Sequence, residues 1–354
     1  MWGRFPVRPS RPWGSFERRP NPQRSVTHRN PQANPRTLLR QHCPRFLAGV
    51  LTALIATTAG CGGPTTDGDT ILLSSNEFGN WQVVVLDIDS SMTYQITGDP
   101  SDAGPPSTYQ VLDLSDGPVV EMVDPSWSDV DPTWSPDGEQ IAVSSNRFGD
   151  FELLVLDGRG SVLDQLTDNA TSDGQPSWSP NGEWIAFTSD RTGDVEIFVM
   201  RPDGTQVEQL TDSPGEDWQP AWSPDSQFLA FASNRNGNWD IFVMRPDGTQ
   251  VEQLTDSPGE DWQPAWSPDS QFLAFASNRN GNWDIFVMRP DGTQVEQLTY
   301  SPDSDLEPVW SPDGRHLTFT TNRRGNLEVY LMDLADGKVR ATGQRGIPHG
   351  WRTG

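Results

Sequence analysis

The fold is decided by residues 220–255, which read PAWSPDSQFLAFASNRNGNWDIFVMRPDGTQVEQLT. The same letters return unchanged at residues 264–299, and the identity extends further, because residues 197–255 reappear as residues 241–299. Looser copies begin at Pro132, Pro176 and Pro308. One tryptophan in each copy marks a constant spacing of 44 residues: Trp134, Trp178, Trp222, Trp266 and Trp310. A fixed period of this length predicts a repeat architecture.

Each repeat is predicted to form four short antiparallel strands. Apolar runs lie around Trp222 and at residues 228–232, 239–244 and 251–254, and none has the spacing of an amphipathic helix. Turn residues separate these runs: Ser-Pro-Asp after the first, Asn-Gly after the second and Pro-Asp-Gly after the third. Pro and Asp suit a type I turn, and Asn-Gly supplies the positive φ angles of a tight hairpin.

The middle strands are apolar on both faces. Phe228 and Ala230 point to one side of the expected sheet, and Leu229 and Phe231 point to the other. One repeat cannot cover both faces of its own sheet, but neighbouring repeats stacked face to face can, as the blades of a propeller do. The sequence therefore favours an all-β propeller.

The repeat pattern resembles a known family. PxWSPDG, a short apolar strand, SNRxGNxEI, a further strand and a PDGT turn followed by QLT are similar to the WD40-like repeat of TolB-type β-propellers. The resemblance covers roughly residues 70–354 and implies a six-bladed β-propeller of four-stranded antiparallel blades. The expected blades are residues 70–97 with a C-terminal strand, 132–167, 176–211, 220–255, 264–299 and 308–342.

The resemblance also implies a context of protein assembly at the cell envelope. TolB itself carries an N-terminal α/β domain, whereas only residues 62–69 separate the expected export signal from the first blade. Related blades occur in prolyl-oligopeptidase-type enzymes and in oligogalacturonate lyases, so the resemblance alone leaves an enzyme open as the alternative.

The N-terminal region resembles an export signal. Residues 1–45 hold ten arginines and one glutamate and are expected to form no core. Residues 46–61 combine an apolar run with Thr58-Ala59-Gly60-Cys61, in which small residues precede a cysteine as they do in a bacterial lipobox. We expect export and lipidation at Cys61, with an ordinary signal peptide and an unmodified Cys61 as the alternative. The protein would then lie on the periplasmic or extracellular face of the envelope, held to the membrane by lipid alone.

Charge excludes one class of partner. The whole chain has 25 basic and 49 acidic residues, and removing residues 1–61 leaves 15 against 48, a net charge of about −33. Nucleic acid is an improbable partner for such a chain, because phosphate binding needs positive charge. We expect a monomer that binds an envelope protein or a cell-surface polymer.

The first blade is incomplete in its own part of the sequence. Residues 70–97 match strands two to four of a repeat but lack the PxWSP strand. Residues 347–351, IPHGW, and residues 125–128, PSWS, could each supply it. The C-terminal segment is the expected one, since it would close the ring and remove an exposed sheet edge. Residues 98–131 are expected to form an inserted hairpin, either a filler or a determinant of partner choice.

Residues with catalytic or metal-binding chemistry are scarce. The mature part has two histidines, His316 and His349, which are too few for a His-based metal site, and it has no GxSxG nucleophile motif. We therefore expect no catalytic residue, no metal and no cofactor. The aspartates of the SPDG and PDGT turns are expected to bind their own turn backbone rather than calcium.

Two further repeated features are expected to be structural. The repeat tryptophans should pack between blades rather than form a ligand-stacking ring. An arginine in each second hairpin is followed four to five residues later by an acid, which predicts a repeated ion pair. The expected pairs are Arg147 with Glu152, Arg191 with Glu196, Arg235 with Asp240, Arg279 with Asp284, and Arg323 with Glu328.

One surface candidate remains. In a propeller the second hairpin and the connection between blades share a face, so two tryptophans should gather there among acids. The candidate partner-binding residues are Trp218, Trp262, Glu216, Asp217, Glu260 and Asp261. Exposed tryptophans among acids suit recognition of a protein or a sugar polymer, but they could instead only seal the gap between blades.

Three functions follow from these features. The first is a non-catalytic binding scaffold at the cell envelope. The second is a hydrolase or lyase acting on cell-surface glycan or peptide through carboxylates at the mouth of the propeller channel, and its mark would be a paired Asp or Glu of raised pKa without a balancing arginine. The third is a spacer whose blades have multiplied without a ligand.

Overall fold

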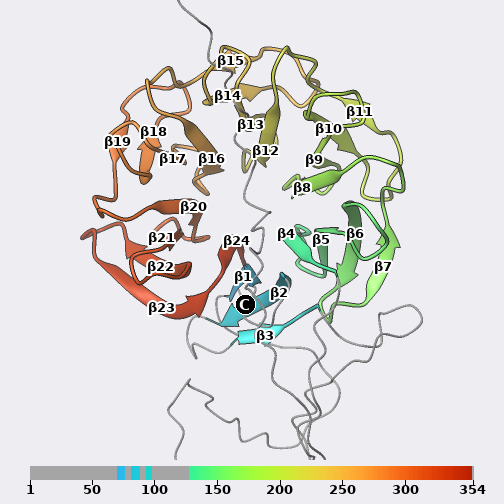
Figure 1. Cartoon of the computed structure of the whole chain (residues 1–354), viewed down its shortest axis with the longest axis horizontal. Helices are drawn as coiled ribbons and strands as arrows, with labels where there is room; N and C mark the ends of the chain where they lie inside the picture. Colours follow the sequence, from blue (N-terminus) through green and yellow to red (C-terminus); the bar gives the residue numbers. More distant parts are fainter. Residues whose placement is uncertain (1–69, 76–80, 88–92, 98–126, 353–354) are drawn as a thin grey trace, which may run out of the picture. The chain divides into compact units, whose positions relative to one another are not determined.

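The computed structural model describes residues 70–75, 81–87, 93–97 and 127–352. These residues form six four-stranded antiparallel sheets arranged as the blades of one propeller, and the described part of the chain contains no helix (Figure 1). The predicted fold class is confirmed. Residues 1–69, with the predicted signal and lipid site, and residues 98–126 of the predicted inserted hairpin lie outside the described residues.

The blades follow the chain, with one exception at the point of closure. Blade 1 consists of β24 (Ile347–Arg352), β1 (Thr70–Ser75), β2 (Gln82–Asp87) and β3 (Thr93–Gln95). Blade 2 consists of β4 (Asp129–Trp134), β5 (Gln140–Ser145), β6 (Glu152–Asp157) and β7 (Val162–Gln165). Blade 3 consists of β8 (Asp173–Trp178), β9 (Ile185–Ser189), β10 (Glu196–Met200) and β11 (Glu208–Gln209).

The other three blades repeat this order. Blade 4 consists of β12 (Asp217–Trp222), β13 (Leu229–Ser233), β14 (Asp240–Met244) and β15 (Glu252–Gln253). Blade 5 consists of β16 (Asp261–Trp266), β17 (Leu273–Ser277), β18 (Asp284–Met288) and β19 (Glu296–Gln297). Blade 6 consists of β20 (Asp305–Trp310), β21 (His316–Thr321), β22 (Glu328–Asp333) and β23 (Val339–Arg345).

The C-terminal strand closes the ring. β24 pairs antiparallel with β1, so the last residues of the chain form the inner strand of blade 1. The rival source of this strand was wrong, because Trp127 and Ser128 lead into β4, which pairs with β5 in blade 2. Closure joins the two ends of the propeller by backbone hydrogen bonds, which leaves no open inner edge.

The core lies between the blades rather than within them. One cluster combines Ala186 and Ile197 of blade 3 with Trp222, Phe231 and other side chains of blade 4. Phe231 is fully buried, as are its counterparts in the neighbouring repeats. The tandem order of the sequence therefore creates the hydrophobic core, since each sheet is covered by the next copy of itself.

Three of the five repeat tryptophans bind the neighbouring inner strand by a hydrogen bond. The indole Nε1 of Trp222 donates to the carbonyl of Ser177 at 3.0 Å, and Trp266 donates to Ala221 at 3.1 Å. Trp310 donates to the carbonyl of Ala265 at 3.0 Å in the same way. These side chains are packed between blades, as the sequence predicted.

The structure differs from the predicted strand lengths at both ends of a blade. The inner strand of blade 4 is longer than expected and begins at Asp217, and the outer strand contains only Glu252 and Gln253. The inner strand is longer because its backbone pairs with β13 from Asp217 onward, before the apolar residues around Trp222 begin. The outer strand is short because it is exposed and pairs with β14 on one side only.

Candidate functional site at the ring axis

The third residue of each inner strand contributes to a ring of polar side chains. The inner strands β4, β8, β12, β16, β20 and β24 contact one another in a closed circle around the centre of the propeller (Figure 1). The six residues at this position are Asp131, Gln175, Gln219, Gln263, Glu307 and His349.

A bulge in each inner strand places these side chains. In blade 4, Trp218 pairs with Ala232 and Ala221 with Ala230, so Gln219 and Pro220 together stand opposite a single residue of β13. Gln219 has a φ of 59°, in the left-handed region that side-chain-bearing residues rarely adopt. Pro220 has no N–H to leave unpaired, which makes it suited to the bulge. The register of β24 against β1 also skips His349.

An amide network occupies half of the ring. The backbone N–H of Gln219 donates to Oε1 of Gln175 at 2.9 Å, and the N–H of Gln263 donates to Oε1 of Gln219 at 2.9 Å. The N–H of Glu307 donates to Oε1 of Gln263 at 3.0 Å, and Nε2 of Gln263 donates to Oε1 of Glu307 at 2.5 Å. The backbone N–H groups that the bulges expose are thus satisfied by the neighbouring blade.

The network stops on either side of His349 and Asp131. The N–H of Gln175 donates to Oγ of Ser144 at 3.0 Å and not to Asp131. Among the described residues, Nε2 of His349 is buried without a hydrogen-bond partner, and Asp131 accepts no hydrogen bond. We call Glu307, His349 and Asp131 the axial half-ring. Asp131 and Nε2 of His349 have hydrogen-bonding capacity that the described residues do not use.

Enclosure shifts the titration of all three groups. Burial raises the pKa of Glu307 to about 8, with repulsion from the Asp131 carboxylate as the second cause. Burial alone raises the pKa of Asp131 to about 6 and lowers the pKa of His349 to about 3. At neutral pH the half-ring therefore holds a protonated Glu307, a neutral imidazole and an ionised Asp131.

This arrangement can do two kinds of chemistry. A carboxylate beside neutral hydrogen-bonding groups can bind a cationic group that donates hydrogen bonds. A protonated carboxyl and an ionised one can also act as general acid and general base. No group of three or more His, Cys, Asp or Glu side chains among the described residues has a geometry that could hold a metal ion.

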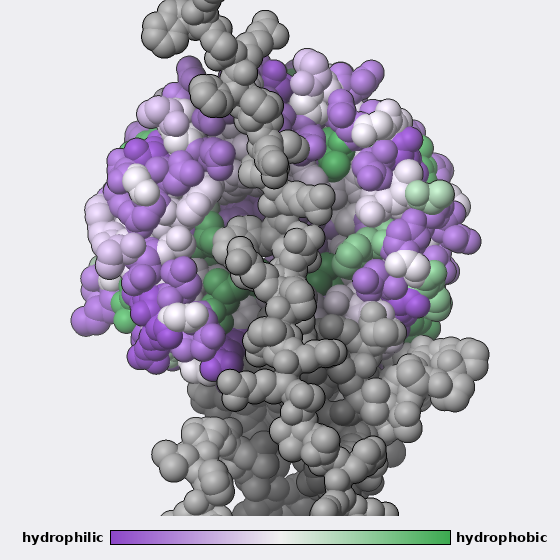
Figure 2. Space-filling view, in the orientation of Figure 1, coloured by the Kyte–Doolittle hydropathy of each residue, from purple (hydrophilic) through white to green (hydrophobic). Residues whose placement is uncertain are grey.

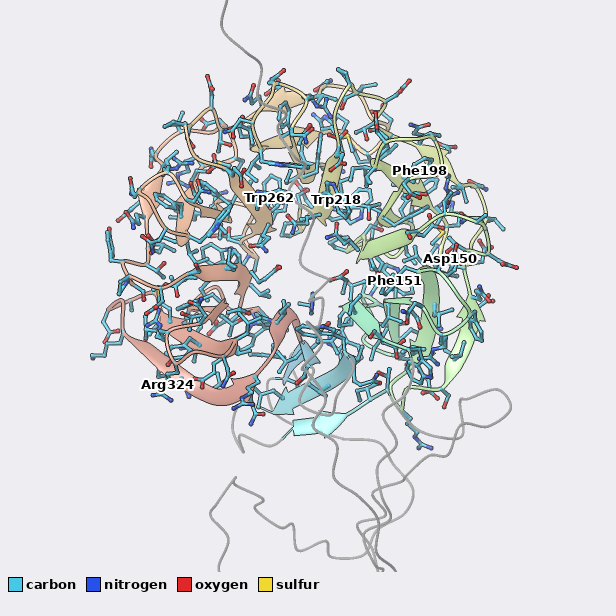
Figure 3. The ribbon with its side chains drawn as sticks, viewed as in Figure 1. Asp150, Phe151, Phe198, Trp218, Trp262 and Arg324 are labelled. Carbon is cyan, nitrogen blue, oxygen red and sulfur yellow. The ribbon has the colours of Figure 1, made fainter. Side chains whose placement is uncertain are left out.

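The predicted surface candidate is only partly at the surface. The carboxylates of Asp217 and Asp261 are fully buried. Trp218 and Trp262 are half-buried and pack against the same apolar cluster between blades 4 and 5 (Figure 3). Nε1 of Trp218 donates to Oε2 of Glu216 at 3.2 Å.

Trp262 has an aromatic neighbour that Trp218 lacks. Its ring lies 4.0 Å from that of Trp239 in blade 4. The residue of blade 3 that corresponds to Trp239, 44 positions earlier, is Val195. Both indoles therefore help to seal the gaps between blades, and Glu216 and Glu260 remain as half-buried acids beside them.

The repeated ion pair exists, but the predicted acidic partners were wrong. Each hairpin arginine binds the aspartate that begins the inner strand of its own blade, 18 residues earlier. In blade 4, Arg235 lies 2.8 Å from Asp217, and its guanidinium stands 4.8 Å from the Phe242 ring centroid. The cause is that strands one and two are adjacent, so the hairpin turns the arginine back over the start of strand one.

Four of the acids expected to bind these arginines instead accept hydrogen bonds from the end of their own blade or from the connection that follows it: Glu152, Glu196, Asp240 and Asp284. Oγ1 of Thr211 donates to Oε2 of Glu196 at 2.5 Å, and the N–H of Ser213 donates to its other oxygen at 3.0 Å. Burial, together with the neighbouring Asp217 carboxylate, raises the pKa of Glu196 to about 7. Burial and the Asp261 carboxylate raise the pKa of Asp240 to about 6.

The turn aspartates bind their own backbone, as predicted. In the first turn of blade 4, Oδ1 of Asp225 accepts hydrogen bonds from Ser223 Oγ at 2.6 Å and from the N–H of Gln227 at 3.0 Å. In the third turn, Oδ1 of Asp247 accepts from the N–H and the hydroxyl of Thr249. These bonds lower the pKa of Asp247.

No helix in the described part of the chain is long and apolar enough to cross a membrane. The side chains on the visible face of the propeller are mainly hydrophilic (Figure 2).

Comparison with known families identifies this propeller. The profile of the TolB beta propeller domain family matches residues 106–213, 206–304 and 256–349, which together exceed half of the chain. The architecture defined by the fold is that of a six-bladed propeller of tandem repeats. The chain belongs to the TolB beta propeller domain family. A search of curated proteins finds no match by sequence.

Solved structures share the fold at low sequence identity. A protein described as TolB from Agrobacterium tumefaciens is 22% identical with a TM-score of 0.59, over 78% of this chain and 88% of that one. TolB from Acinetobacter baumannii is 21% identical with a TM-score of 0.63, over 80% of this chain and 66% of that one. An oligogalacturonate lyase in complex with manganese is 14% identical with a TM-score of 0.51, over 77% and 73%. At these identities the likeness concerns the fold.

The sequence contains a signal for the axial ring in addition to the repeat itself. Five of its six residues directly precede the proline of the PxW motif, at the constant 44-residue spacing. The sixth, His349, joins them only because β24 closes blade 1. Most other positions are similar among the repeats, but this one varies. The ring therefore contains two acids and a histidine instead of six glutamines.

Proposed function

We propose that the chain is a non-catalytic binding scaffold of the bacterial cell envelope, a TolB-like propeller that holds another envelope protein or a cell-surface polymer. The observation that carries this proposal is the axial half-ring. Asp131 and Nε2 of His349 belong to the ring of inner-strand residues and have no hydrogen-bond partner among the described residues, and Asp131 lies near enough to Glu307 to raise its pKa. A buried polar group without a partner is costly, so a ligand that supplies the missing bonds is favoured.

The charge state of the half-ring suggests what the partner contributes. Near neutral pH the pKa values of about 6, 8 and 3 leave one negative charge, on Asp131. A lysine or arginine side chain would neutralise that charge and donate hydrogen bonds to Nε2 of His349 and to the carbonyl oxygen of Glu307. The partner is therefore expected to present a cationic group at the axis.

A rigid frame supports a role in binding. The amide network, the tryptophan bonds between blades and the β24 closure fix the inner strands relative to one another. A site held in this way loses little conformational freedom when a partner binds, which favours affinity.

The surface candidate belongs to the same proposal. Trp218, Trp262, Glu216 and Glu260 lie on blades 4 and 5, and we include their exposed parts as a second contact region. The proposal also includes export, lipidation at Cys61 and a location on the periplasmic or extracellular face. It is supported by the signal-like residues 46–61 and by membership of the TolB propeller family.

Capture from membranes tests the binding role. Tagged protein carrying residues 62–354 would be incubated with detergent extracts of the native membranes, beside a variant with Asp131→Gln, Glu307→Gln and His349→Gln. The variant extends the amide chemistry of Gln175, Gln219 and Gln263 around the ring. The proposal predicts a protein that the wild type enriches at least about tenfold over the variant. Equal recovery by both proteins would refute an axial binding site.

A second candidate function is supported by a specific observation. Glu307 and Asp131 are two carboxyls of raised pKa with no arginine near enough to pair with either among the described residues. This meets the criterion for a hydrolase or lyase that uses an acid and a base at the axis. The fold of the oligogalacturonate lyase and of a puromycin hydrolase adds a reason to test it.

Turnover assays separate the two candidates. Oligogalacturonides, peptidoglycan fragments and aminoacyl amides would be incubated with the wild type, with Glu307→Gln and with Asp131→Asn. The enzyme candidate predicts product with the wild type and a loss of at least about a hundredfold with either variant. The scaffold predicts no product above the level of the variants.

A further inference from the structure

Most basic residues of the propeller are already engaged in its structure. Five arginines bind buried aspartates at the starts of the inner strands. Three more lie 4.0 to 4.3 Å from aromatic ring centroids, where they also donate to a backbone carbonyl: Arg201, Arg245 and Arg289. These eight arginines have little capacity left for a partner.

Blade 6 differs from the other repeats in charge. Residues 308–342 contain five basic and four acidic residues, a balance of +1. Residues 132–167 and 176–211 each contain two basic and six acidic residues, and residues 220–255 and 264–299 each contain two and four. The corresponding balances are −4, −4, −2 and −2. Blade 6 is thus the one repeat of these five with a positive balance.

The outer strand of this blade is also the longest in the ring. β23 has 7 residues, whereas β3 has 3, β7 has 4, and β11, β15 and β19 have 2 each. It ends the order β20-β21-β22-β23, so one of its edges has no strand partner among the described residues, and it is visible as the long arrow at the rim (Figure 1). A long exposed edge is a template for pairing with another extended segment.

Packing holds β23 in place, with a bulge at residues 342–344 where Gly343 has a φ of 84°. Its residues pair antiparallel with β22 from Met332–Val339 to Glu328–Arg345, with an irregularity between. Ala341 packs against the apolar cluster between blades 5 and 6, and the Thr342 hydroxyl donates to the carbonyl of Val329 at 2.8 Å. The free edge is therefore preformed rather than assembled on binding.

Two arginines on this strand are free of acidic partners. Arg340 and Arg345 are exposed, and neither lies within salt-bridge distance of an Asp or Glu among the described residues. Other basic residues of the blade already have an acidic partner: Arg315 is near Asp313, Arg324 is near Glu328, and Lys338 is 2.5 Å from Asp336. The free positive charge of the blade is thus concentrated on the strand with the free edge.

We propose that β23 is a docking edge for an acidic, extended segment of a partner protein, which adds to blade 6 as a fifth strand. Backbone hydrogen bonds to the free edge supply affinity, and carboxylates opposite Arg340 and Arg345 supply selectivity. The rest of the propeller is acidic and repels such a segment, so charge directs it to this edge. This surface is separate from the axial half-ring and does not depend on it.

Pairing between two copies of the chain at this edge is disfavoured. An antiparallel β23–β23 contact would bring Arg340 and Arg345 of one copy close to the same residues of the other. Like charges facing each other across strands are destabilising. The same arginines that attract an acidic strand therefore protect the edge from self-association, which is a common use of charge on edge strands.

A peptide binding assay tests the proposal. The probe is a fluorescein-labelled, amidated decapeptide that alternates glutamate with valine and threonine, and the comparison peptide has lysine at every glutamate position. Binding to protein carrying residues 62–354 is measured by fluorescence anisotropy at low salt. The test variant is Arg340→Glu with Arg345→Glu. The matched control is Arg315→Glu with Arg324→Glu, which makes the same change of charge on turns of the same blade.

The expected result has three parts. The acidic probe binds, the lysine probe leaves the hydrogen exchange of residues 339–345 unchanged, and the β23 variant binds the acidic probe at least about tenfold more weakly than the control variant. Hydrogen exchange of the wild type then shows new protection at residues 339–345 when the acidic probe is added. Equal weakening in both variants, or protection confined to other strands, would overturn the proposal. A wild-type dimer that the β23 variant abolishes would also overturn it, in favour of pairing between copies.

Discussion

Replacing Glu307 by glutamine should change how stability depends on pH. The folded protein holds this carboxyl at a pKa of about 8, against an ordinary value of 4.5. Below pH 4.5 it is protonated in both the folded and the unfolded chain. Between pH 4.5 and 8 the unfolded chain releases a proton that the folded chain keeps, so the free energy of unfolding of the wild type falls as pH rises. Above pH 8 Glu307 is ionised in both states, and the full cost of burying its charge lowers the free energy of unfolding.

The size of the effect follows from the shift. Each unit of pKa corresponds to about 1.4 kcal/mol, so the shift sets an upper limit on the order of 5 kcal/mol. Partial contact of Glu307 with solvent screens this, and we expect roughly 2 kcal/mol. Glutamine keeps the shape of the side chain and its carbonyl can still accept from Nε2 of Gln263. Glu307→Gln should therefore match the wild type at pH 5 and exceed it in stability at pH 9.

Urea unfolding of wild type and variant at pH 5, 7 and 9 measures the difference. Other carboxyls with raised pKa values, such as Glu196, affect both proteins equally and cancel. An exposed carboxyl on β11, Glu208→Gln, is the control and should show no such trend. Curves for wild type and Glu307→Gln that remain parallel across this range of pH would refute the enclosure of Glu307.

Three further outcomes are expected. Arg235→Ala should lower the free energy of unfolding by about 3–5 kcal/mol because it leaves the buried Asp217 without its cation, whereas Arg245→Ala should cost about 1 kcal/mol or less; similar losses in chemical denaturation would contradict this. Trp262→Ala should cost about 1 kcal/mol more than Trp218→Ala, since only Trp262 stacks on Trp239; equal melting temperatures would argue against the stacking. Removal of residues 347–354 should abolish cooperative unfolding because blade 1 loses β24, whereas removal of residues 353–354 should not; an unchanged melting temperature after the longer truncation would disprove closure by β24.

The sequence was sufficient to predict the strands of a blade but not which charged side chains within the blade bind each other. Turn residues and apolar runs determine local pairing, so the four-stranded meander followed directly from residues 220–255. Arg235 was assigned to Asp240 because the two are close in sequence, yet it binds Asp217 across the first strand pair. A hairpin brings residues 18 positions apart into contact, and sequence distance is then a poor guide to spatial distance.

The candidate site could be predicted only in part. Gln219 and its equivalents are defined by a position before proline, but their role depends on a bulge with positive φ and on bonds to the next blade. His349 is linked to them by ring closure alone. Asp217 and Asp261 were expected at the surface but are buried. Each begins an inner strand and forms an ion pair with an arginine of the second hairpin, a contact that the sequence alone does not reveal. Identical repeats therefore predict the frame, and the differences among inner strands indicate the site.

The central claim is that a partner binds at the axial half-ring, and carboxyl footprinting tests it most directly. Free protein and the complex recovered from membranes would each be labelled with a carbodiimide and glycine ethyl ester and mapped by mass spectrometry. We expect labelling of Asp131 and Glu307 to fall at least about fivefold in the complex, while labelling of the exposed Glu208 stays the same. Unchanged labelling of both axial carboxyls in a complex that protects other acids would contradict the account.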